Sequence, residues 1–357
     1  MNVATYEALR SQFDVHYVGP VNPPIFYPQK IRSKLWRLTG FQGDFFFFSE
    51  RRLRVIAREV NARRRPDAVM DFFHGFTSWP LSRIERPYIA SSDCTFHDYI
   101  EIFHRRDLFT GRDLARIEAA EADWLKRASM VLLRSRWAAD RAVRHYGLDP
   151  MKVDTVRSCG EIDMPPDDRF DGARRFVFVS TNFRAKGGDV VLAAFRDVRR
   201  RHPDASLTIV GDRPADLASH DGVVAAGFLR KEDPEEVARF RDILAGAMAL
   251  VLPTRGDVSP LIIAEAGYFG CPAIASRRFA IPELVLDGAT GILLDDPRDA
   301  GAVARAMTWM IEHEHEYRRM RIGAWDRSRS EYSRPQFEKR VVDFVNQVMQ
   351  TTTRLKG

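Results

Sequence analysis

The chain has 357 residues, a length typical of about two domains, and its apolar and charged fractions are those of a globular protein. Its cysteines, Cys94, Cys159 and Cys271, are far apart and show no CxxC spacing. This argues against a disulfide framework or a zinc site and favours a reducing compartment. No stretch is apolar over the length that spans a bilayer, and residues 1–10 lack the apolar segment of a signal peptide. We therefore expect a cytoplasmic protein.

The formal net charge of +6 comes mainly from arginine, and basic residues concentrate beside aromatic ones in the region 30–65. Two interpretations of this basic 30–65 region stay open. Charge patterning by itself favours a solvated helix face. The same surface would also suit peripheral contact with an anionic membrane, on its inner face. Nucleic acid is not an expected partner, because no helix-turn-helix, zinc-finger or RNP-type signature accompanies the charge.

In the first half of the chain, short apolar runs alternate with longer segments of helical periodicity. The predicted helices span 4–10, 50–64, 113–128 and 137–146. The predicted strands span 15–18, 68–73, 88–91 and 131–134. This alternation predicts βα units around a mostly parallel sheet.

A segment rich in Pro and Asp, 162–175, is the predicted interdomain linker. Beyond it, the predicted strands span 176–180, 206–210, 223–226, 248–252, 273–276 and 290–294. The predicted helices span 188–201, 234–246, 259–269, 282–286, 298–312 and 318–349, the last with a break near 333–335. We predict an α/β protein of two doubly wound, Rossmann-like domains: 1–165, with helix 330–350 packing back onto it, and 172–328. Ligands would bind in the cleft beyond the carboxyl ends of the strands.

The most informative segment follows the predicted strand that ends at Pro253. A short loop leads into a helix for which Ser259 is the predicted N-cap and Pro260 the first helical residue. Free backbone amides at such a helix start suit an anion such as a diphosphate. Asp257 precedes the helix and Glu265 lies two turns along it. The two carboxylates can therefore accept hydroxyl groups at opposite ends of one extended ligand.

A second loop, between the predicted strand 176–180 and the following helix, carries two cations. Arg184 and Lys186 precede Gly187 and Gly188, which allow a close approach of the backbone. Arginine and lysine at this place would neutralise a leaving diphosphate.

Together, these segments resemble the family-4 (group 1) glycosyltransferases. The matching residues are Phe183 to Gly188, Gly227-Phe228-Leu229, the acidic-x7-glutamate pair Asp257 and Glu265, Gly270-Cys-Pro272, Ile281-Pro-Glu283 and Asp287-Gly288-x-x-Gly291. The resemblance covers the C-terminal half densely and the N-terminal half only in layout.

The resemblance implies the GT-B fold, a nucleotide-diphosphate sugar as donor substrate, transfer with retention, and neither a cofactor nor a metal bound by a DxD motif. The implied donor-binding residues are Arg184, Lys186, Phe228, Asp257, Ser259, Leu261 and Glu265. Of these, Arg184 and Lys186 would hold the diphosphate, and Asp257 would bind sugar hydroxyls. Glu265 would meet the ribose, Phe228 would lie beside the base, and the amides of Ser259 and Leu261 would add phosphate contacts.

Three departures from the family pattern stand out. Asp257 occupies a position where the family more often has Glu, and Pro260 one where Gly is commoner. The strand and Gly-rich loop that usually precede the first helix are missing from the sequence as printed, so we expect a fold without that strand.

In the N-terminal half, Asp93 follows the predicted strand 88–91, where the family often places a polar residue near the transferred sugar. It joins Asp257, Lys186 and Arg184 as a catalytic candidate, although an aspartate that caps the next helix is an equal alternative. His74, Asp93 and His97 are the acceptor-side candidates; for the histidines, a structural role is the commoner alternative.

The predicted function is thus hexosyl transfer to a glycan or lipid-linked acceptor in bacterial cell-surface polysaccharide synthesis. The alternative is a degenerate, non-catalytic GT-B protein that binds sugar nucleotides or serves as a scaffold. An epimerase or a phosphorylase on the same fold is a further rival, although a phosphorylase would need a much longer chain. A nicotinamide oxidoreductase is disfavoured because no GxGxxG follows a strand.

Overall fold

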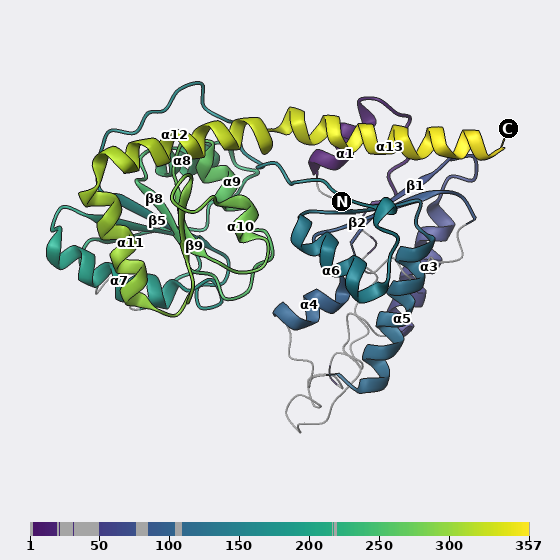
Figure 1. Cartoon of the computed structure of the whole chain (residues 1–357), viewed down its shortest axis with the longest axis horizontal. Helices are drawn as coiled ribbons and strands as arrows, with labels where there is room; N and C mark the ends of the chain where they lie inside the picture. Colours follow the sequence, from purple (N-terminus) through teal and green to yellow (C-terminus); the bar gives the residue numbers. More distant parts are fainter. Residues whose placement is uncertain are drawn as a thin grey trace. The chain divides into compact units, whose positions relative to one another are not determined.

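The computed structural model describes residues 3–19, 21, 31, 50–75, 85–103, 109–215, 217 and 220–356. The chain divides into two compact units, each with its own parallel sheet (Figure 1). Unit 1 comprises 1–157 and 337–357, and unit 2 comprises 158–336. The predicted domain bounds differ from this division at residues 158–171 and 329–336, which belong to unit 2, and at residues 351–357, which belong to unit 1. The predicted α/β class with parallel sheets is confirmed.

Unit 1 is built on a four-stranded sheet in which each strand pairs in parallel with the next, in the order β1-β2-β3-β4. The strands are β1 (Asp71–His74), β2 (Tyr88–Ser92), β3 (Met130–Leu133) and β4 (Val153–Thr155). The helices are α1 (Val3–Arg10), α3 (Glu50–Arg63), α4 (Phe96–Phe103), α5 (Gly111–Arg127), α6 (Arg136–Tyr146), the short 3-10 helix η4 (Pro150–Lys152) and most of α13 (Arg334–Lys356).

Helix α5 shows how the sequence builds the core of this unit. Thr110 accepts the backbone N–H of Asp113 and so caps the helix start. The buried face of the helix carries Trp124, whose ring stacks on Tyr88 of β2 with centroids 4.3 Å apart. The Tyr88 hydroxyl donates to the Trp124 carbonyl at 2.6 Å, so this large buried side chain also satisfies its polar group.

Three elements of unit 1 differ from the prediction. The strand predicted at 15–18 is wrong, because residues 14–19 have no regular structure. Strand β4 and helix α4 were not predicted. Strand β4 has only three residues, of which Asp154 is exposed, and so it is too short to show an alternating apolar pattern in the sequence.

Unit 2 is built on a six-stranded parallel sheet in the order β10-β9-β8-β5-β6-β7. The strands are β5 (Arg175–Ser180), β6 (Ser206–Gly211), β7 (Val223–Gly227), β8 (Ala249–Leu252), β9 (Ala273–Ser276) and β10 (Gly291–Leu294). The helices are α7 (Gly188–Arg201), α8 (Pro234–Ala245), α9 (Leu261–Gly267), α10 (Ile281–Leu284), α11 (Ala300–Glu312) and α12 (Glu314–Glu331).

The strand order of unit 2 reverses direction at β5. From β5 the chain passes to β6 and β7 on one side of the sheet, and then returns to place β8, β9 and β10 on the other. Strands β5 and β8 pair directly, with Phe176 opposite Ala249 and Val177 opposite Leu250. Loops that follow the two strands therefore meet at a topological switch point, the place where open α/β sheets bind ligands.

The predicted linker 162–175 is an integral part of unit 2. Ile162 is buried in its hydrophobic core. Both carboxylate oxygens of Asp168 accept hydrogen bonds of 2.6 Å from Arg321 of α12, and the Arg321 guanidinium lies 4.2 Å from the ring centroid of Phe170. The aspartates that suggested a solvated linker thus include one that pairs with a buried arginine.

The membrane-facing prediction rests on residues that the structure describes only in part. Of the basic 30–65 region, residue 31 and residues 50–65 are described, and the rest lies outside the described ranges. Across those ranges, the helices lack the combined length and apolarity needed to cross a bilayer.

Candidate functional site

The loop after β5 packs tightly against the end of β8. Gly187 adopts a φ of 83°, a conformation that favours glycine. A Cβ atom at this position would lie 2.3 Å from the carbonyl oxygen of Pro253. The sequence thus needs a glycine here to bring the two loops of the switch point together.

This close packing brings Lys186 and Asp257 into contact. The Lys186 Nζ forms an ion pair with the Asp257 carboxylate and lies 3.3 Å from the carbonyl oxygen of Gly256. The two side chains are 20% and 21% exposed, so the pair remains reachable from solvent. Two residues predicted for the same ligand therefore lie side by side, one from each loop of the switch point.

Helix α9 begins later than predicted. It starts at Leu261, and the capping position is occupied by Pro260, which makes no side-chain hydrogen bond to the helix. The predicted N-cap at Ser259 is therefore wrong. Pro260 has a φ of −64° and a ψ of 113°, which is an extended conformation outside the helix. The φ that its ring fixes is compatible both with the residue before a helix and with the first residue within one.

Glu265 of α9 is 2% exposed and is held by two donors at Oε1. The backbone N–H of Glu161 donates at 2.9 Å, and Lys231 Nζ donates at 2.6 Å. Its other oxygen, Oε2, accepts no hydrogen bond from the residues that the structure describes. This arrangement leaves one carboxylate oxygen for a ligand.

The partner Lys231, in the loop between β7 and α8, was missed by the sequence analysis. Its ammonium also lies 3.1 Å from Glu161 Oε2. Burial opposes the charge of Lys231, but the neighbouring Glu265 and Glu161 carboxylates outweigh it and raise the pKa of the ammonium. The sequence feature that could have pointed to Lys231 is its position, two residues after the Gly227-Phe228-Leu229 segment. Phe228 itself is 63% exposed at the end of β7.

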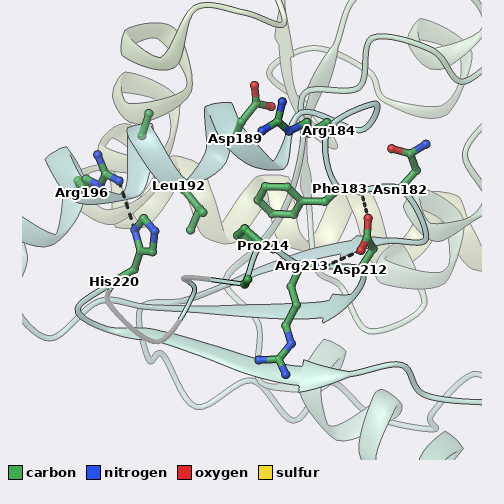
Figure 2. Close-up of a pocket in the computed structure, with 12 residues that line it drawn as sticks. Asn182, Phe183, Arg184, Asp189, Leu192, Arg196, Asp212, Arg213, Pro214 and His220 are labelled. Atoms are coloured by element: carbon green, nitrogen blue, oxygen red, sulfur yellow. Dashed lines mark hydrogen bonds between the residues drawn. The ribbon is translucent and has the colours of Figure 1, made fainter.

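Arg184 lies in the wall of a cavity whose lining includes neither Lys186 nor Asp257. The cavity has a volume of about 690 Å³ and opens at the carboxyl ends of β5 and β6 (Figure 2). Its wall includes residues 182–184 after β5 and 212–215 after β6, the two segments being joined by a 2.9 Å hydrogen bond from the Phe183 N–H to Asp212. Among the described residues, the Arg184 guanidinium has no ion-pair partner, whereas its carbonyl accepts from Arg255 at 2.9 Å. Asp257 and Glu265 do not line this cavity.

Two acceptor-side candidates lie at the corresponding edge of the sheet in unit 1. His74 ends β1 and Asp93 follows β2. Arg134, which follows β3 and which the sequence analysis missed, has its Nε 3.7 Å from Asp93 Oδ1 and is 3% exposed. Burial, aided by the Arg134 charge, lowers the pKa of His74 to about 4, so His74 is neutral at neutral pH.

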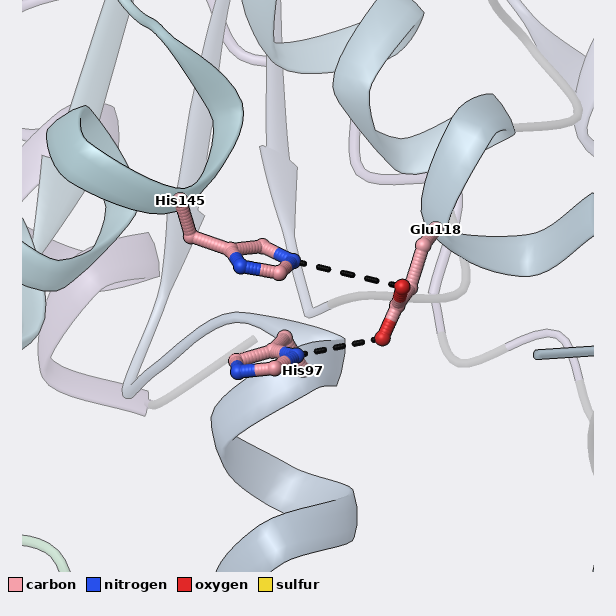
Figure 3. A group of neighbouring side chains, drawn as sticks. All are labelled: His97, Glu118 and His145. Atoms are coloured by element: carbon pink, nitrogen blue, oxygen red, sulfur yellow. Dashed lines mark hydrogen bonds and ion pairs between the residues drawn. The ribbon is translucent and has the colours of Figure 1, made fainter. Parts of the chain in front are cut away.

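The alternative role of Asp93 as a helix cap is wrong. Thr95 fills that role, because its Oγ1 accepts the backbone N–H of Asp98 at 3.3 Å at the start of α4. His97, the third acceptor-side candidate, belongs to a different cluster. It faces Glu118 and His145 (Figure 3).

The architecture matches solved structures of the GT-B class. HepE from Anabaena, solved in complex with UDP, superposes with a TM-score of 0.60 at 14% identity, over 83% of this chain and 82% of that chain. The chain therefore has the GT-B fold, as predicted from the sequence.

Sequence comparisons identify the family of the domain that carries the switch point. Residues 173–313 match the model for glycosyl transferases group 1, so the chain contains a group 1 glycosyltransferase domain. It is 28% identical over 200 residues to D-inositol 3-phosphate glycosyltransferase of Corynebacterium kroppenstedtii, covering 48% of this chain and 44% of the relative. It is 31% identical over 204 residues to the GDP-mannose-dependent alpha-(1-6)-phosphatidylinositol monomannoside mannosyltransferase of Mycolicibacterium smegmatis, covering 50% and 52%. The chain thus matches about half the length of these curated relatives.

Proposed function

We propose that the chain is a retaining glycosyltransferase that moves a sugar from a nucleotide-diphosphate sugar to a glycan or lipid-linked acceptor. The observation that carries the proposal is the meeting of Lys186 and Asp257 at the switch point of the group 1 domain. There the Lys186 ammonium, which suits phosphate, and the Asp257 carboxylate, which suits hydroxyl groups, are close enough to bind one ligand.

The ion pair gives a simple account of donor binding. The Lys186 ammonium would exchange the Asp257 carboxylate for diphosphate oxygens, and Asp257 would then be free to accept hydroxyl groups of the transferred sugar. Arg184, whose guanidinium has no ion-pair partner among the described residues, would supply a second positive charge. Basic side chains would thereby meet the leaving-group charge, which is the basis for proposing a reaction without a metal or cofactor.

Glu265 is suited to the ribose end of the donor. Its Oε2 accepts no hydrogen bond within the described ranges, while Lys231 and the Glu161 N–H fix its orientation through Oε1. A pre-oriented carboxylate binds hydroxyl groups with little loss of side-chain entropy. Ser259 and Leu261 would add backbone contacts, and the exposed Phe228 would lie against the base.

On the acceptor side, we assign His74, Asp93 and the buried Arg134 to the carboxyl edge of the first sheet. For retention, the acceptor would attack from the face that the diphosphate leaves, and a diphosphate oxygen would take the acceptor proton. The chain would then contribute positioning and electrostatic stabilisation, the part that Arg184, Lys186 and Asp93 would perform.

The names of the relatives guide the choice of substrates to test. HepE was solved with UDP, and the mycobacterial relative uses GDP-mannose and an inositol lipid. These share a nucleoside diphosphate, which is the group that Lys186 would bind. We further propose that the chain acts in the cytoplasm on acceptors for bacterial cell-surface polysaccharide, at the inner face of the membrane.

The test is a thermal-shift and calorimetric screen of nucleoside diphosphates and their sugars, in the presence of chelator, on the wild type and on Lys186→Ala and Glu265→Ala. The exposed Lys339→Ala is the matched control. One nucleotide should raise the Tm of the wild type and of the control but of neither site variant. Turnover of that donor, followed by product formation, then distinguishes an enzyme from a binding protein. Equal binding by the wild type and both site variants would refute the assigned site.

A further inference from the structure

Three helices of unit 1 place two imidazoles and a carboxylate together. His97 comes from α4, Glu118 from α5 and His145 from α6 (Figure 3). His97 Nδ1 lies 3.1 Å from one Glu118 oxygen and His145 Nε2 lies 4.0 Å from the other. The potential ligand atoms all lie within 4.8 Å of one another.

The donor set has the chemistry of a transition-metal site. Two imidazoles and one carboxylate suit Zn²⁺ and its neighbours, whereas Mg²⁺ and Ca²⁺ prefer oxygen ligands throughout. Around a tetrahedral zinc ion, ligand atoms lie about 3.4 Å apart, as follows from metal–ligand bonds of about 2.1 Å. The two imidazole rings are stacked, with centroids 3.6 Å apart and an interplanar angle of 21°, so metal binding would require the rings to tilt until one nitrogen of each faces the ion.

A buried hydrogen-bond cluster holds the same three helices in place beside this group. The carboxylate of Glu121, which is 3% exposed, accepts the backbone N–H of Phe96 at 2.9 Å and the hydroxyl of Tyr146. Phe96 and Tyr146 are the chain neighbours of His97 and His145, and Glu121 lies one turn from Glu118. The backbone that carries each candidate ligand is therefore fixed, as a preformed metal site requires.

The second nitrogen of His97 also has a suitable partner. Glu101 Oε2 lies 3.8 Å from His97 Nε2, and Arg141 holds the Glu101 carboxylate. If Nδ1 binds a metal, Nε2 carries the proton and faces Glu101 Oε2, which is close enough to accept a hydrogen bond after a small movement of either side chain. Metal-binding histidines commonly show this arrangement, which fixes the tautomer and the orientation of the ring.

The cluster is also open to solvent. The side chains of His97, Glu118 and His145 are 20%, 22% and 34% exposed, respectively. An ion can therefore enter, and a water molecule can complete its coordination. We propose that His97, Glu118 and His145 bind one divalent transition-metal ion of the zinc type, which fastens α4, α5 and α6 together. This site is separate from the proposed donor site and does not depend on the proposed function.

The test uses the full-length chain without an affinity tag, stripped of metal, and titrated with Zn²⁺ and with Co²⁺. We expect one ion per chain, a rise in Tm, and the strong visible absorption of four-coordinate Co²⁺. The variants His97→Ala, His145→Ala and Glu118→Gln should each weaken binding at least about tenfold. Glu118→Gln keeps the side-chain shape, and circular dichroism checks that each variant folds.

A matched control addresses binding elsewhere on the surface. His315 is exposed on α12 between Glu314 and Glu316, and His315→Ala should leave the affinity and the Co²⁺ spectrum unchanged. If Zn²⁺ binds the three site variants as tightly as the wild type, or if His315→Ala removes the binding, the proposal fails. The cluster is then a polar group in which Glu118 hydrogen-bonds to His97 and has a longer contact, of 4.0 Å, with His145.

Discussion

Gly187 and Pro253 lie in direct backbone contact, one in the loop after β5 and the other at the end of β8. The space for a Cβ atom on Gly187 is occupied by the Pro253 carbonyl oxygen, which would lie 2.3 Å away. Lys186 and Asp257 extend from the loops that this contact holds together. Packing at this glycine therefore sets the geometry of the proposed diphosphate site.

Gly187→Ala should lower both stability and donor affinity. The substitution combines a strained φ of 83° with a backbone clash, and we expect a loss of about 3 kcal/mol in the free energy of unfolding. Gly172 is the matched control, because it has the same φ and nothing within 4 Å of an added Cβ. Gly172→Ala should cost about 1 kcal/mol and leave donor binding intact. Equal losses in urea unfolding of the two variants would show that the contact with Pro253 is unimportant.

The elements of unit 2 were predictable because its strands are short, mainly apolar runs between turn residues. Helix 188–201 and strand 273–276 were predicted with the bounds that the structure shows. The sequence also assigned Lys186 and Asp257 to the same donor, through the family resemblance. Neither the order of those strands nor the contact itself can be read from local patterns.

The features that the sequence did not disclose depend on pairs of residues far apart in the chain. In the sequence Lys231 looks like any surface lysine, and its role becomes visible only from its contacts with Glu265, 2.6 Å away, and with Glu161. Asp168 likewise belongs to a segment that was predicted as an interdomain linker, and its ion pair with the buried Arg321 places it in unit 2. His97 could not be linked to Glu118 and His145, because α4 itself escaped prediction.

Lys186 and Asp257 should affect different parts of the donor. Lys186→Ala should weaken a nucleoside diphosphate and its sugar alike, by roughly 10- to 100-fold, because it removes a charged contact to phosphate. Asp257→Asn should weaken the sugar nucleotide about tenfold and leave the free diphosphate bound as well or better, because a repulsive carboxylate is lost. Calorimetry with both ligands measures the difference. The assignment of Asp257 to the sugar is wrong if its variant weakens both ligands equally.

Removal of Lys231 should leave the buried Glu265 carboxylate without its counter-charge. Since the lysine side chain is 34% exposed, we expect Lys231→Met to cost only about 1–2 kcal/mol in the free energy of unfolding. Adding Glu265→Gln should restore most of that loss, because the remaining partner is then neutral. A double-mutant cycle in urea at neutral pH gives the coupling between the two residues. Additive effects would mean that the pair contributes nothing to stability.

Glu121 should make the stability of unit 1 depend on pH. Burial raises the pKa of its carboxyl to about 8, despite the hydrogen bonds from Tyr146 and Phe96, whereas the unfolded chain titrates near 4.5. Between these values the folded state holds a proton that the unfolded state has lost. The contribution of this group to the free energy of unfolding is therefore fully present below pH 4.5. It decreases as the pH rises from 4.5 and is lost as the pH passes 8. The total decrease is roughly 5 kcal/mol at most.

Glu121→Gln should flatten this dependence, because glutamine resembles the protonated carboxyl and can still accept the Phe96 N–H. Urea unfolding from pH 5 to pH 9, with chelator present, should show similar stability for the variant and the wild type at the acid end. At the alkaline end, the variant should be the more stable. The exposed Glu235→Gln on α8 serves as control and should follow the wild type throughout. Parallel curves for wild type and Glu121→Gln would mean that Glu121 is already ionised in the folded protein, held by the hydroxyl of Tyr146 and the Phe96 amide.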